Sequence, residues 1–282
     1  MKYREYSDAA SFFKRSASFL EKNEAVNSLM IGLSLELDKA PFLYSDQNPY
    51  FATVTDNSEI LIAALMTPPY KILLSSAETV PDDAVSFLVE CIDPGKWTVP
   101  GVLAEHKLAE TFTFFWKSKY KIKTIPGMDQ RIYKLTQIEQ AGKACGEMRP
   151  AAAGDSDLVA DWVYKFNKEI FTTENRENAQ RLANALLEQK SVFFWYDNAP
   201  VSMAATLRPT AHGTTVGYVY TPPYLRNNGY AGTLVAQLSR QILDSGKNFC
   251  TLYTDLSNPT SNSIYKKIGY KPVADVIDIF FE

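Results

Sequence analysis

Cysteine and histidine are scarce in this chain of 282 residues, which holds three cysteines and two histidines. Cys91, Cys145 and Cys250 lie far apart and form no CxxC motif. That spacing is typical of reduced thiols in a cytosol rather than of a disulfide framework. With so few possible ligands and no paired cysteines or histidines, the sequence predicts no metal site.

An excess of one charge and long apolar runs are missing as well. The formal net charge is −3, which provides no broad basic field, so we expect no binding to nucleic acid. No apolar run approaches the length of a membrane span, and the first residues, MKYREYSDAA, lack the apolar core of a signal peptide. The sequence therefore predicts a soluble, cytoplasmic protein without a membrane partner, and it leaves the oligomeric state open.

Helical and strand-like patterns are present, and their order occurs twice. In the first half, helical patterns begin near Ser7 or Asp8 and at Asn27, and later elements follow at 50–54, 59–65 and 71–75 (strands), 104–118 (helix) and 131–135 (strand). In the second half, the patterns predict a strand at 148–151, helices at 153–170 and about 175–189, and strands at 191–196, 201–208 and 214–221. The polar stretch from Thr136 to Glu147 is the predicted linker.

Two segments of the halves align without a gap. DNSEILIAALMTP (56–68) and DNAPVSMAATLRP (197–209) agree at Asp, at Asn, at two adjacent Ala and at the final Pro. Chance agreement of a common hairpin pattern is the alternative. The matching helix-helix-hairpin order favours a tandem duplication. We therefore expect an α/β (α+β) protein with two domains, residues 1–140 and 146–282.

The most informative segment is LRNNGYAG (225–232), between a predicted strand and a predicted amphipathic helix. At a helix N-terminus, unpaired N–H groups and the positive end of the dipole favour phosphate oxygens. Gly229 lets the backbone approach a ligand closely, while Ala231 and Gly232 leave room for a diphosphate. A plain strand-to-helix connection is the alternative. The first half has AETVPDDAV in the corresponding place, so a phosphate site is expected only in the second half.

The spacing Arg226-x-x-Gly229-x-Ala231 resembles the [Q/R]-x-x-G-x-[G/A] acyl-CoA motif of the GNAT N-acetyltransferase superfamily. NPTSNSIYKKIGY (258–270) is similar to the same family's N-x-x-[A/S]-x-x-x-Y-x-x-x-G-[F/Y] signature, in the usual order and separation. The resemblance is carried by residues 216–273 and fits the whole second half. It implies two GNAT-like domains, each a mixed, mostly antiparallel sheet flanked by helices, of which the first is degenerate.

The resemblance implies acetyl-CoA as cosubstrate and a role for each matching residue. Val219 and Thr221 would offer main-chain groups to the pantetheine arm, with Tyr220 between them pointing away. The loop after Arg226 would wrap the pyrophosphate, and Tyr265 would point at the CoA sulfur as the catalytic residue. The implied cofactor-binding residues are Val219, Tyr220, Thr221, Arg226, Asn227, Asn228, Gly229, Tyr230, Ala231, Gly232, Asn258 and, more weakly, Asn262.

The chemistry of acyl transfer requires a donor for the leaving thiolate, and a tyrosine with a pKa of about 10 stays protonated at neutral pH. An aromatic packed under the sheet is the alternative interpretation of Tyr265. No carboxylate precedes the loop on its strand, so the general base stays open among a water chain and the side chains of Tyr218, Glu169, Glu174 and Asp255. His106 and His212 are interpreted as surface residues.

We therefore expect an N-acetyltransferase that transfers an acetyl group from acetyl-CoA to a primary amine of a small molecule or peptide. A non-catalytic acyl-CoA sensor or interaction module is the alternative, and the missing carboxylate favours it. Transfer of a longer acyl or aminoacyl group is a third possibility. The first domain would serve as a wall of the acceptor pocket or as a structural partner, and the sequence does not identify the acceptor.

Overall fold

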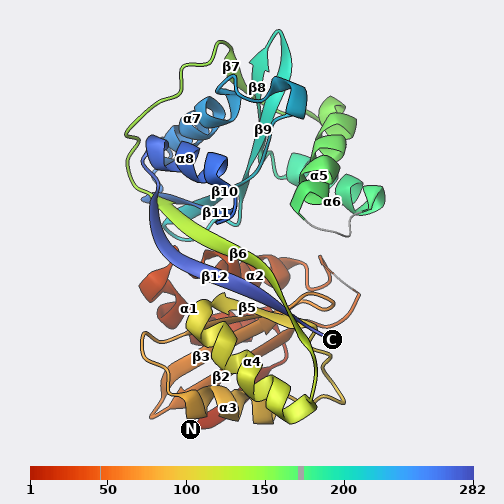
Figure 1. Cartoon of the computed structure of the whole chain (residues 1–282), viewed down its shortest axis with the longest axis vertical. Helices are drawn as coiled ribbons and strands as arrows, with labels where there is room; N and C mark the ends of the chain where they lie inside the picture. The colour runs from red at the N-terminus through yellow and green to blue at the C-terminus, as the bar shows by residue number, and fades with distance from the viewer. Residues whose placement is uncertain (45, 171–174) are drawn as a thin grey trace. The chain divides into compact units, whose positions relative to one another are not determined.

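The chain forms two compact units in a computed structural model that describes residues 1–44, 46–170 and 175–282 (Figure 1). Unit 1 contains Met1–Ile132, Thr254–Asn258 and Pro272–Glu282, and unit 2 contains Tyr133–Tyr253 and Pro259–Lys271. Each unit is built on a mixed, mostly antiparallel sheet with helices beside it. The expected fold class is therefore confirmed.

Unit 1 has the strand order β1-β2-β3-β4-β5-β12, in which only β4 and β5 pair in parallel among the pairs with a described register. Its strands are β1 (Lys2–Tyr6), β2 (Tyr50–Asp56), β3 (Glu59–Met66), β4 (Ile72–Ser76), β5 (Gly101–Glu105), β12 (Lys271–Phe281) and most of β6 (Thr124–Leu135). Its helices are α1 (Ala9–Leu20), α2 (Ser28–Lys39), α3 (Asp82–Cys91) and α4 (His106–Tyr120), and a 3-10 turn, η1 (Glu21–Asn23), follows α1.

Unit 2 has the strand order β11-β10-β9-β8-β7, with the end of β6 beside β11. Its strands are β7 (Glu147–Pro150), β8 (Val192–Asp197), β9 (Ala199–Leu207), β10 (Gly213–Tyr220) and β11 (Phe249–Asp255). Its helices are α5 (Ser156–Ile170), α6 (Arg176–Glu188), α7 (Tyr230–Asp244) and α8 (Pro259–Ile268), with 3-10 turns η2 (Ala153–Asp155) and η3 (Pro223–Leu225). Figure 1 shows α5 and α6 on one side of these strands and α7 and α8 on the other.

The predicted domain boundaries, 1–140 and 146–282, differ from this division. The last strand of the chain, β12, lies in unit 1 and pairs antiparallel with β5, from Val276 opposite Glu105 to Phe280 opposite Gly101. Conversely, Tyr133–Leu135 at the end of β6 lie in unit 2. A strand can pair with any strand whose edge is exposed, whatever its place in the chain. Boundaries drawn along the sequence therefore do not describe this arrangement.

The two aligned segments form matching hairpins. Asn57 and Asn198 both have positive φ, 45° and 59°, and each donates to the aspartate before it, over 3.2 Å. The β2–β3 ladder shifts register between Val54 and Thr55, and the β8–β9 ladder shifts between Trp195 and Tyr196. Both the turn and the bulge thus recur at the same spacing of the two segments, which supports the duplication inferred from the sequence.

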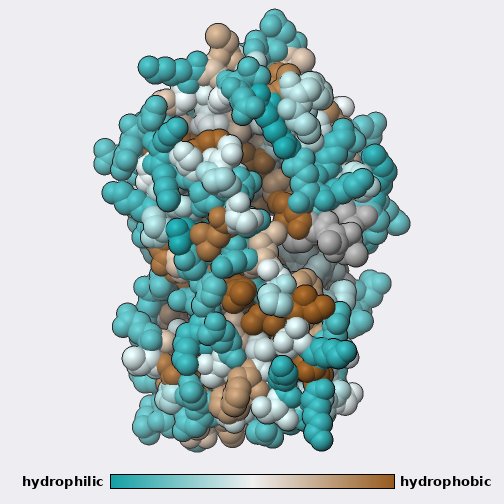
Figure 2. Space-filling model, in the orientation of Figure 1, coloured by the Kyte–Doolittle hydropathy of each residue, from teal (hydrophilic) through white to brown (hydrophobic). Residues whose placement is uncertain are grey.

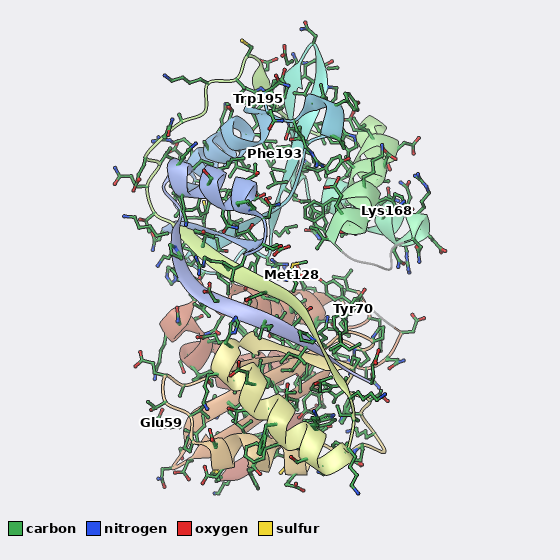
Figure 3. The ribbon with its side chains drawn as sticks, in the orientation of Figure 1. Glu59, Tyr70, Met128, Lys168, Phe193 and Trp195 are labelled. Atoms are coloured by element: carbon green, nitrogen blue, oxygen red, sulfur yellow. The ribbon has the colours of Figure 1, made fainter. Side chains whose placement is uncertain are left out.

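Each sheet buries apolar side chains on both faces, so strands such as β3 and β8 are largely apolar. On β8, Phe193 and Trp195 (Figure 3) pack towards α7 and α8, whereas Phe194 packs towards α5 and α6. This alternation follows from the two-residue period of a strand. Four core clusters result, two per sheet, and those in unit 2 hold the elements described below in place.

The outer surface is mostly hydrophilic on the face shown in Figure 2, with small hydrophobic areas. Within the described ranges, no helix is long and apolar enough to span a membrane.

Several elements are weakly marked in the sequence and escape prediction. These are β1, α3, β5 and β12, each 5 to 11 residues long. The helix predicted over 104–118 begins only at His106, because Ala104 and Glu105 complete β5. The predicted linker, 136–147, has no helix or strand before Glu147, but it is attached to unit 2, where the Ala144 N–H donates to Thr233 Oγ1 over 3.2 Å.

Candidate functional site

Strands β10 and β11 separate part-way along their length. They pair in parallel from Gly213 opposite Phe249 to Thr215 opposite Thr251, and the pairing ends there although both strands continue. On the side facing β11, the main chain of β10 beyond Thr215 therefore has no strand partner among the residues that the structure describes. We call this part, residues 216–220 of β10 and 252–253 of β11, the strand opening.

A bulge in β10 accompanies the separation. The register with β9 jumps from Gly217–Ala205 to Tyr220–Met203, which leaves one extra residue on β10, and Tyr218 has φ of 47°. A bulge turns the main chain locally and re-aims its polar groups. Tyr220 beyond it is buried against Trp162, with ring centroids 5.8 Å apart. The side chain of Tyr220 thus points into the α5 side of the sheet, and burial raises the pKa of its hydroxyl.

Ser202 on β9 fixes the end of the bulged strand. Its hydroxyl donates to the Tyr220 carbonyl over 3.1 Å and lies 2.9 Å from Thr221 Oγ1. The sequence offers no signal for this role, because a serine in the middle of an apolar strand is indistinguishable from a residue that only packs.

The segment from Arg226 to Gly232, which we call the glycine loop, enters α7 without a side-chain cap. Gly229 is the residue before the helix, with φ of 78°, and no side chain accepts from the first turn. The first main-chain hydrogen bond of the helix runs from Thr233 N–H to the Gly229 carbonyl over 3.0 Å. The N–H groups of the first turn have no intrahelical acceptor and lie at the positive end of the helix dipole. Such a helix end is suited to a phosphate.

Arg226 holds the glycine loop rather than extending freely from it. Its Nε donates to the Thr221 carbonyl over 3.0 Å, and its Nη2 donates to both carboxylate oxygens of Glu169, at 2.7 and 2.9 Å. Both side chains are close to half exposed. The arginine therefore braces the loop against the strand before it and against α5.

The other side chains of the glycine loop also have defined places. The amide of Asn228 donates to the carbonyls of Leu225 and Arg226, over 3.0 and 3.3 Å, and closes the turn. The Tyr230 hydroxyl donates to Asp197 over 2.8 Å, and this hydrogen bond raises its pKa. Asn227 has φ of 68°, a conformation that asparagine adopts more readily than most residues. The main chain, rather than these side chains, is left to face a ligand.

Tyr265 lies on α8 in the core cluster that also contains Val216 and Leu252 from the strand opening. The side chain is 8% exposed, and its ring packs edge-on against Tyr270, with centroids 6.1 Å apart. Among the described residues, its hydroxyl has no hydrogen-bond partner in the protein. Burial alone raises the pKa of this phenol to about 12. The group therefore remains a proton donor throughout the physiological pH range.

The two asparagines of the second motif differ in their surroundings. Asn262 is 9% exposed, and its Oδ1 accepts from the buried hydroxyl of Tyr133 over 2.9 Å. The contact joins residues 129 positions apart, so no local sequence pattern reveals it. Asn258 directly precedes α8, and its N–H donates to the Asp255 carbonyl over 3.1 Å. Asn258 falls in unit 1, and its role in binding stays a prediction.

Each candidate general base among the described residues is engaged by a neighbouring residue. Glu169 is engaged by Arg226, Asp255 accepts from the Ser257 N–H over 2.7 Å as a turn cap, and Tyr218 packs against Phe166 with ring centroids 5.2 Å apart. Glu174 lies outside the described residues. His106 lies 2.8 Å from Asp129, and the side chains of His106 and Asp129 are both at least 40% exposed. Within the described residues, no group of three His, Cys, Asp or Glu side chains could hold a metal.

The corresponding helix end in unit 1 has the opposite character. There α3 begins at Asp82 after Pro81, with two aspartates in the first turn and no positive φ in the connection from β4. Carboxylates at a helix N-terminus complement the dipole themselves and repel an anion. The loss of a phosphate loop predicted for the first half is therefore visible in the residues around α3.

Comparison with known proteins supports this description. Residues 195–276 match a family model described as FR47-like protein. Solved structures with similar folds include a GNAT-family acetyltransferase from Colwellia psychrerythraea, with 10% identity, all of both chains covered and a TM-score of 0.61. A Drosophila protein has 16% identity, 99% of this chain and 98% of its own covered, and a TM-score of 0.67. A tandem GNAT protein from the clavulanic acid biosynthesis pathway has 8% identity, coverage of 100% and 98%, and a TM-score of 0.56. No curated protein matches by sequence.

These matches agree with the expected fold: the chain has the fold of tandem GNAT proteins. The fold is that of an acetyltransferase family.

Proposed function

We propose that the protein is an N-acetyltransferase that binds acetyl-CoA in its second GNAT-like domain and transfers the acetyl group to a primary amine of a small molecule or peptide. The observation that carries the proposal is the combination of the strand opening, the uncapped glycine loop and the buried Tyr265 in one unit. A non-catalytic sensor would need the strand opening and the glycine loop to bind acyl-CoA. It would not need a buried phenol that has no hydrogen-bond partner among the described residues.

In this proposal the glycine loop binds the diphosphate of the cosubstrate. The N–H groups from Asn227 to Gly232 provide the donors, and Gly229 provides the close approach that a side chain would prevent. Arg226 contributes mainly by holding the loop, since its guanidinium is engaged by Glu169.

The pantetheine arm lies in the strand opening, where main-chain groups of Val219 and Thr221 replace the missing strand partner. Asn262 contacts the arm from α8, where the hydrogen bond that its oxygen accepts from Tyr133 holds the side chain in place. Acetyl-CoA supplies the activated thioester, and no metal takes part in the proposal.

The chain's own groups then handle the charges of the transfer. The amine nitrogen attacks the thioester carbonyl, and main-chain N–H groups at the bulge stabilise the oxyanion. When the carbon–sulfur bond breaks, Tyr265 gives its proton to the sulfur, which leaves as a thiol. The proton lost by the amine passes to water, and water returns a proton to Tyr265.

The first domain contributes structure in this proposal rather than a second catalytic centre. The first turn of α3 carries Asp82 and Asp83, and Pro81 precedes it where Gly229 precedes α7. The sheet of unit 1 also includes β12 from the end of the chain. We therefore assign unit 1 the role of structural partner.

Release of free thiol from acetyl-CoA across a panel of amines tests the function. We expect Tyr265→Phe to lower kcat by about 100-fold or more, with the Kd of acetyl-CoA changed less than about threefold. Tyr70→Phe is the matched control, because Tyr70 is 57% exposed in unit 1 and should leave both values unchanged. Cosubstrate binding without turnover on any amine would favour the acyl-CoA sensor instead.

A further inference from the structure

Arg208 carries a buried polar atom that the fold leaves without a partner. Its Nε is inaccessible to solvent and has no hydrogen bond, and within the described ranges the guanidinium has no carboxylate partner. Arginine presents its N–H groups as a planar fork that matches a carboxylate, and a buried donor without a partner is rare. The terminal nitrogens of Arg208 are not buried, and within the described residues they have no hydrogen-bond partner either, so they can meet an anionic ligand.

The backbone at Arg208 is held in an uncommon conformation. The residue follows the end of β9 and has φ of 46°, in the left-handed region that non-glycine residues seldom adopt. The connection to β10 is fixed by hydrogen bonds of Thr210 with Gly213 and by Lys247 Nζ, which donates to the Thr210 carbonyl over 2.6 Å. A rigid turn thus maintains the unfavourable φ, and strain of this kind is concentrated at functional positions.

The left-handed conformation decides which face of the sheet receives the guanidinium. Leu207 packs towards α5, so strict alternation would turn Arg208 towards α7. Instead, its guanidinium carbon lies 5.9 Å from the ring centroid of Tyr253 on β11. Tyr253 alternates with Cys250 and Leu252, which face α7 and α8, and so lies on the α5 face. Arg208 is therefore on that face too.

This position is beside the strand opening and opposite Tyr265. Tyr253 comes two residues after Thr251, the last paired residue of β11, a distance of about 6.6 Å along the strand. Tyr265 belongs to the core cluster on the other face. An acceptor bound near Arg208 would thus approach the opening from the side opposite the proposed leaving-group donor.

A second cation reinforces the charge of the α5 face. Lys134 lies at the end of β6, and its Nζ is 4.7 Å from the ring centroid of Phe249. Phe249 is two residues before Thr251 and shares its face. Two positive charges repel a polyamine and attract an acceptor with a negative group.

We propose that the acceptor of this protein is an amine that carries a carboxylate, of the amino-acid class, and that Arg208 binds the carboxylate through its two terminal nitrogens. The proposal rests on the proposed acetyl transfer for the reaction, and on Arg208 alone for the binding. In an amino acid a single carbon separates the two groups, so a carboxylate held at Arg208 keeps the amine beside the opening.

Calorimetry on the full chain with saturating free CoA tests the proposal, with the standard amino acids and their carboxamides as probes. We expect at least one amino acid to bind about 10- to 100-fold more tightly than its carboxamide, the difference made by a charge-assisted pair of hydrogen bonds. Arg208→Gln should abolish that preference, and Arg208→Lys should keep only part of it because lysine lacks the fork.

Arg240→Lys on the exposed face of α7 is the control and should change nothing. A thermal unfolding midpoint for each variant separates loss of binding from loss of fold. No amino-acid binding, carboxamides bound as tightly, or a preference that survives in folded Arg208→Gln would each overturn the assignment. Arg208-dependent binding without thiol release would support the carboxylate site and contradict the acetyl transfer. Turnover on neutral amines alone would support the acetyl transfer and contradict the carboxylate site.

Discussion

Replacement of Gly229 by alanine isolates the role of the glycine loop, because the same helix offers a matched control. Gly229 precedes α7 with φ of 78°, and Gly246 follows the helix with φ of 97°. A Cβ built on either residue meets no atom within 4 Å. The two substitutions therefore impose the same kind of backbone strain and no clash with the protein, at opposite ends of one helix.

The expected effects on stability and on binding differ between the two variants. A left-handed alanine costs about 1–2 kcal/mol, so both Gly229→Ala and Gly246→Ala should lower the free energy of unfolding by a similar amount. Only the methyl group at Gly229 occupies space that we assign to the diphosphate. The loss of about one hydrogen bond to a charged group, roughly 1.5–3 kcal/mol, corresponds to a Kd for CoA about 10- to 100-fold weaker.

Isothermal titration with CoA gives the affinity, and urea denaturation of the same samples gives the stability. We expect equal losses of stability in the two variants and a loss of affinity in Gly229→Ala only. If the two variants bound CoA equally well, the glycine loop would not be the diphosphate site, and the interpretation of its geometry would be wrong.

Two further predictions concern ionisable groups. Burial raises the pKa of Tyr265 to about 12, so its contribution to stability is complete below the unfolded value of about 10 and is lost as the pH rises through 12. Between these values the free energy of unfolding of Tyr265→Phe should fall less steeply, by up to about 1.4 kcal/mol per pH unit, and equal slopes in denaturation series would refute the assignment. Glu169→Gln should cost less than about 1 kcal/mol, because its pair with Arg226 is close to half exposed. Its kcat should stay within about threefold, whereas a loss above about 100-fold would make Glu169 the base.

The sequence predicts the elements that have strong local patterns. The hairpin turns at Asn57 and Asn198, the strand before the glycine loop and the helix after it all depend on neighbouring residues, and all occur as expected. The glycine loop itself is recognisable because its glycine and small residues are needed within a few positions. Neighbouring residues are therefore sufficient to predict the position of this loop in the chain.

Features that depend on distant contacts could not be predicted. The place of β12 beside β5 joins residues more than 170 positions apart, and no pattern within either strand selects that partner. Tyr133 positions Asn262 across 129 residues. Arg208 has no neighbouring motif, and only its φ and its buried nitrogen mark it. The ion pair of Arg226 with Glu169 likewise joins the glycine loop to α5. The sequence predicts each of these two elements but gives no sign that they are in contact.

Titration of the intact protein with acetyl-CoA is the most direct test of the central claim, that one of the two GNAT-like domains keeps a working coenzyme site. Calorimetry should give saturable binding of about one molecule per chain, because Asp82 and Asp83 in the first turn of α3 repel a phosphate from the corresponding helix end of unit 1. Absence of binding by folded protein would contradict the account, and two equivalent sites per chain would contradict the degeneracy of the first domain.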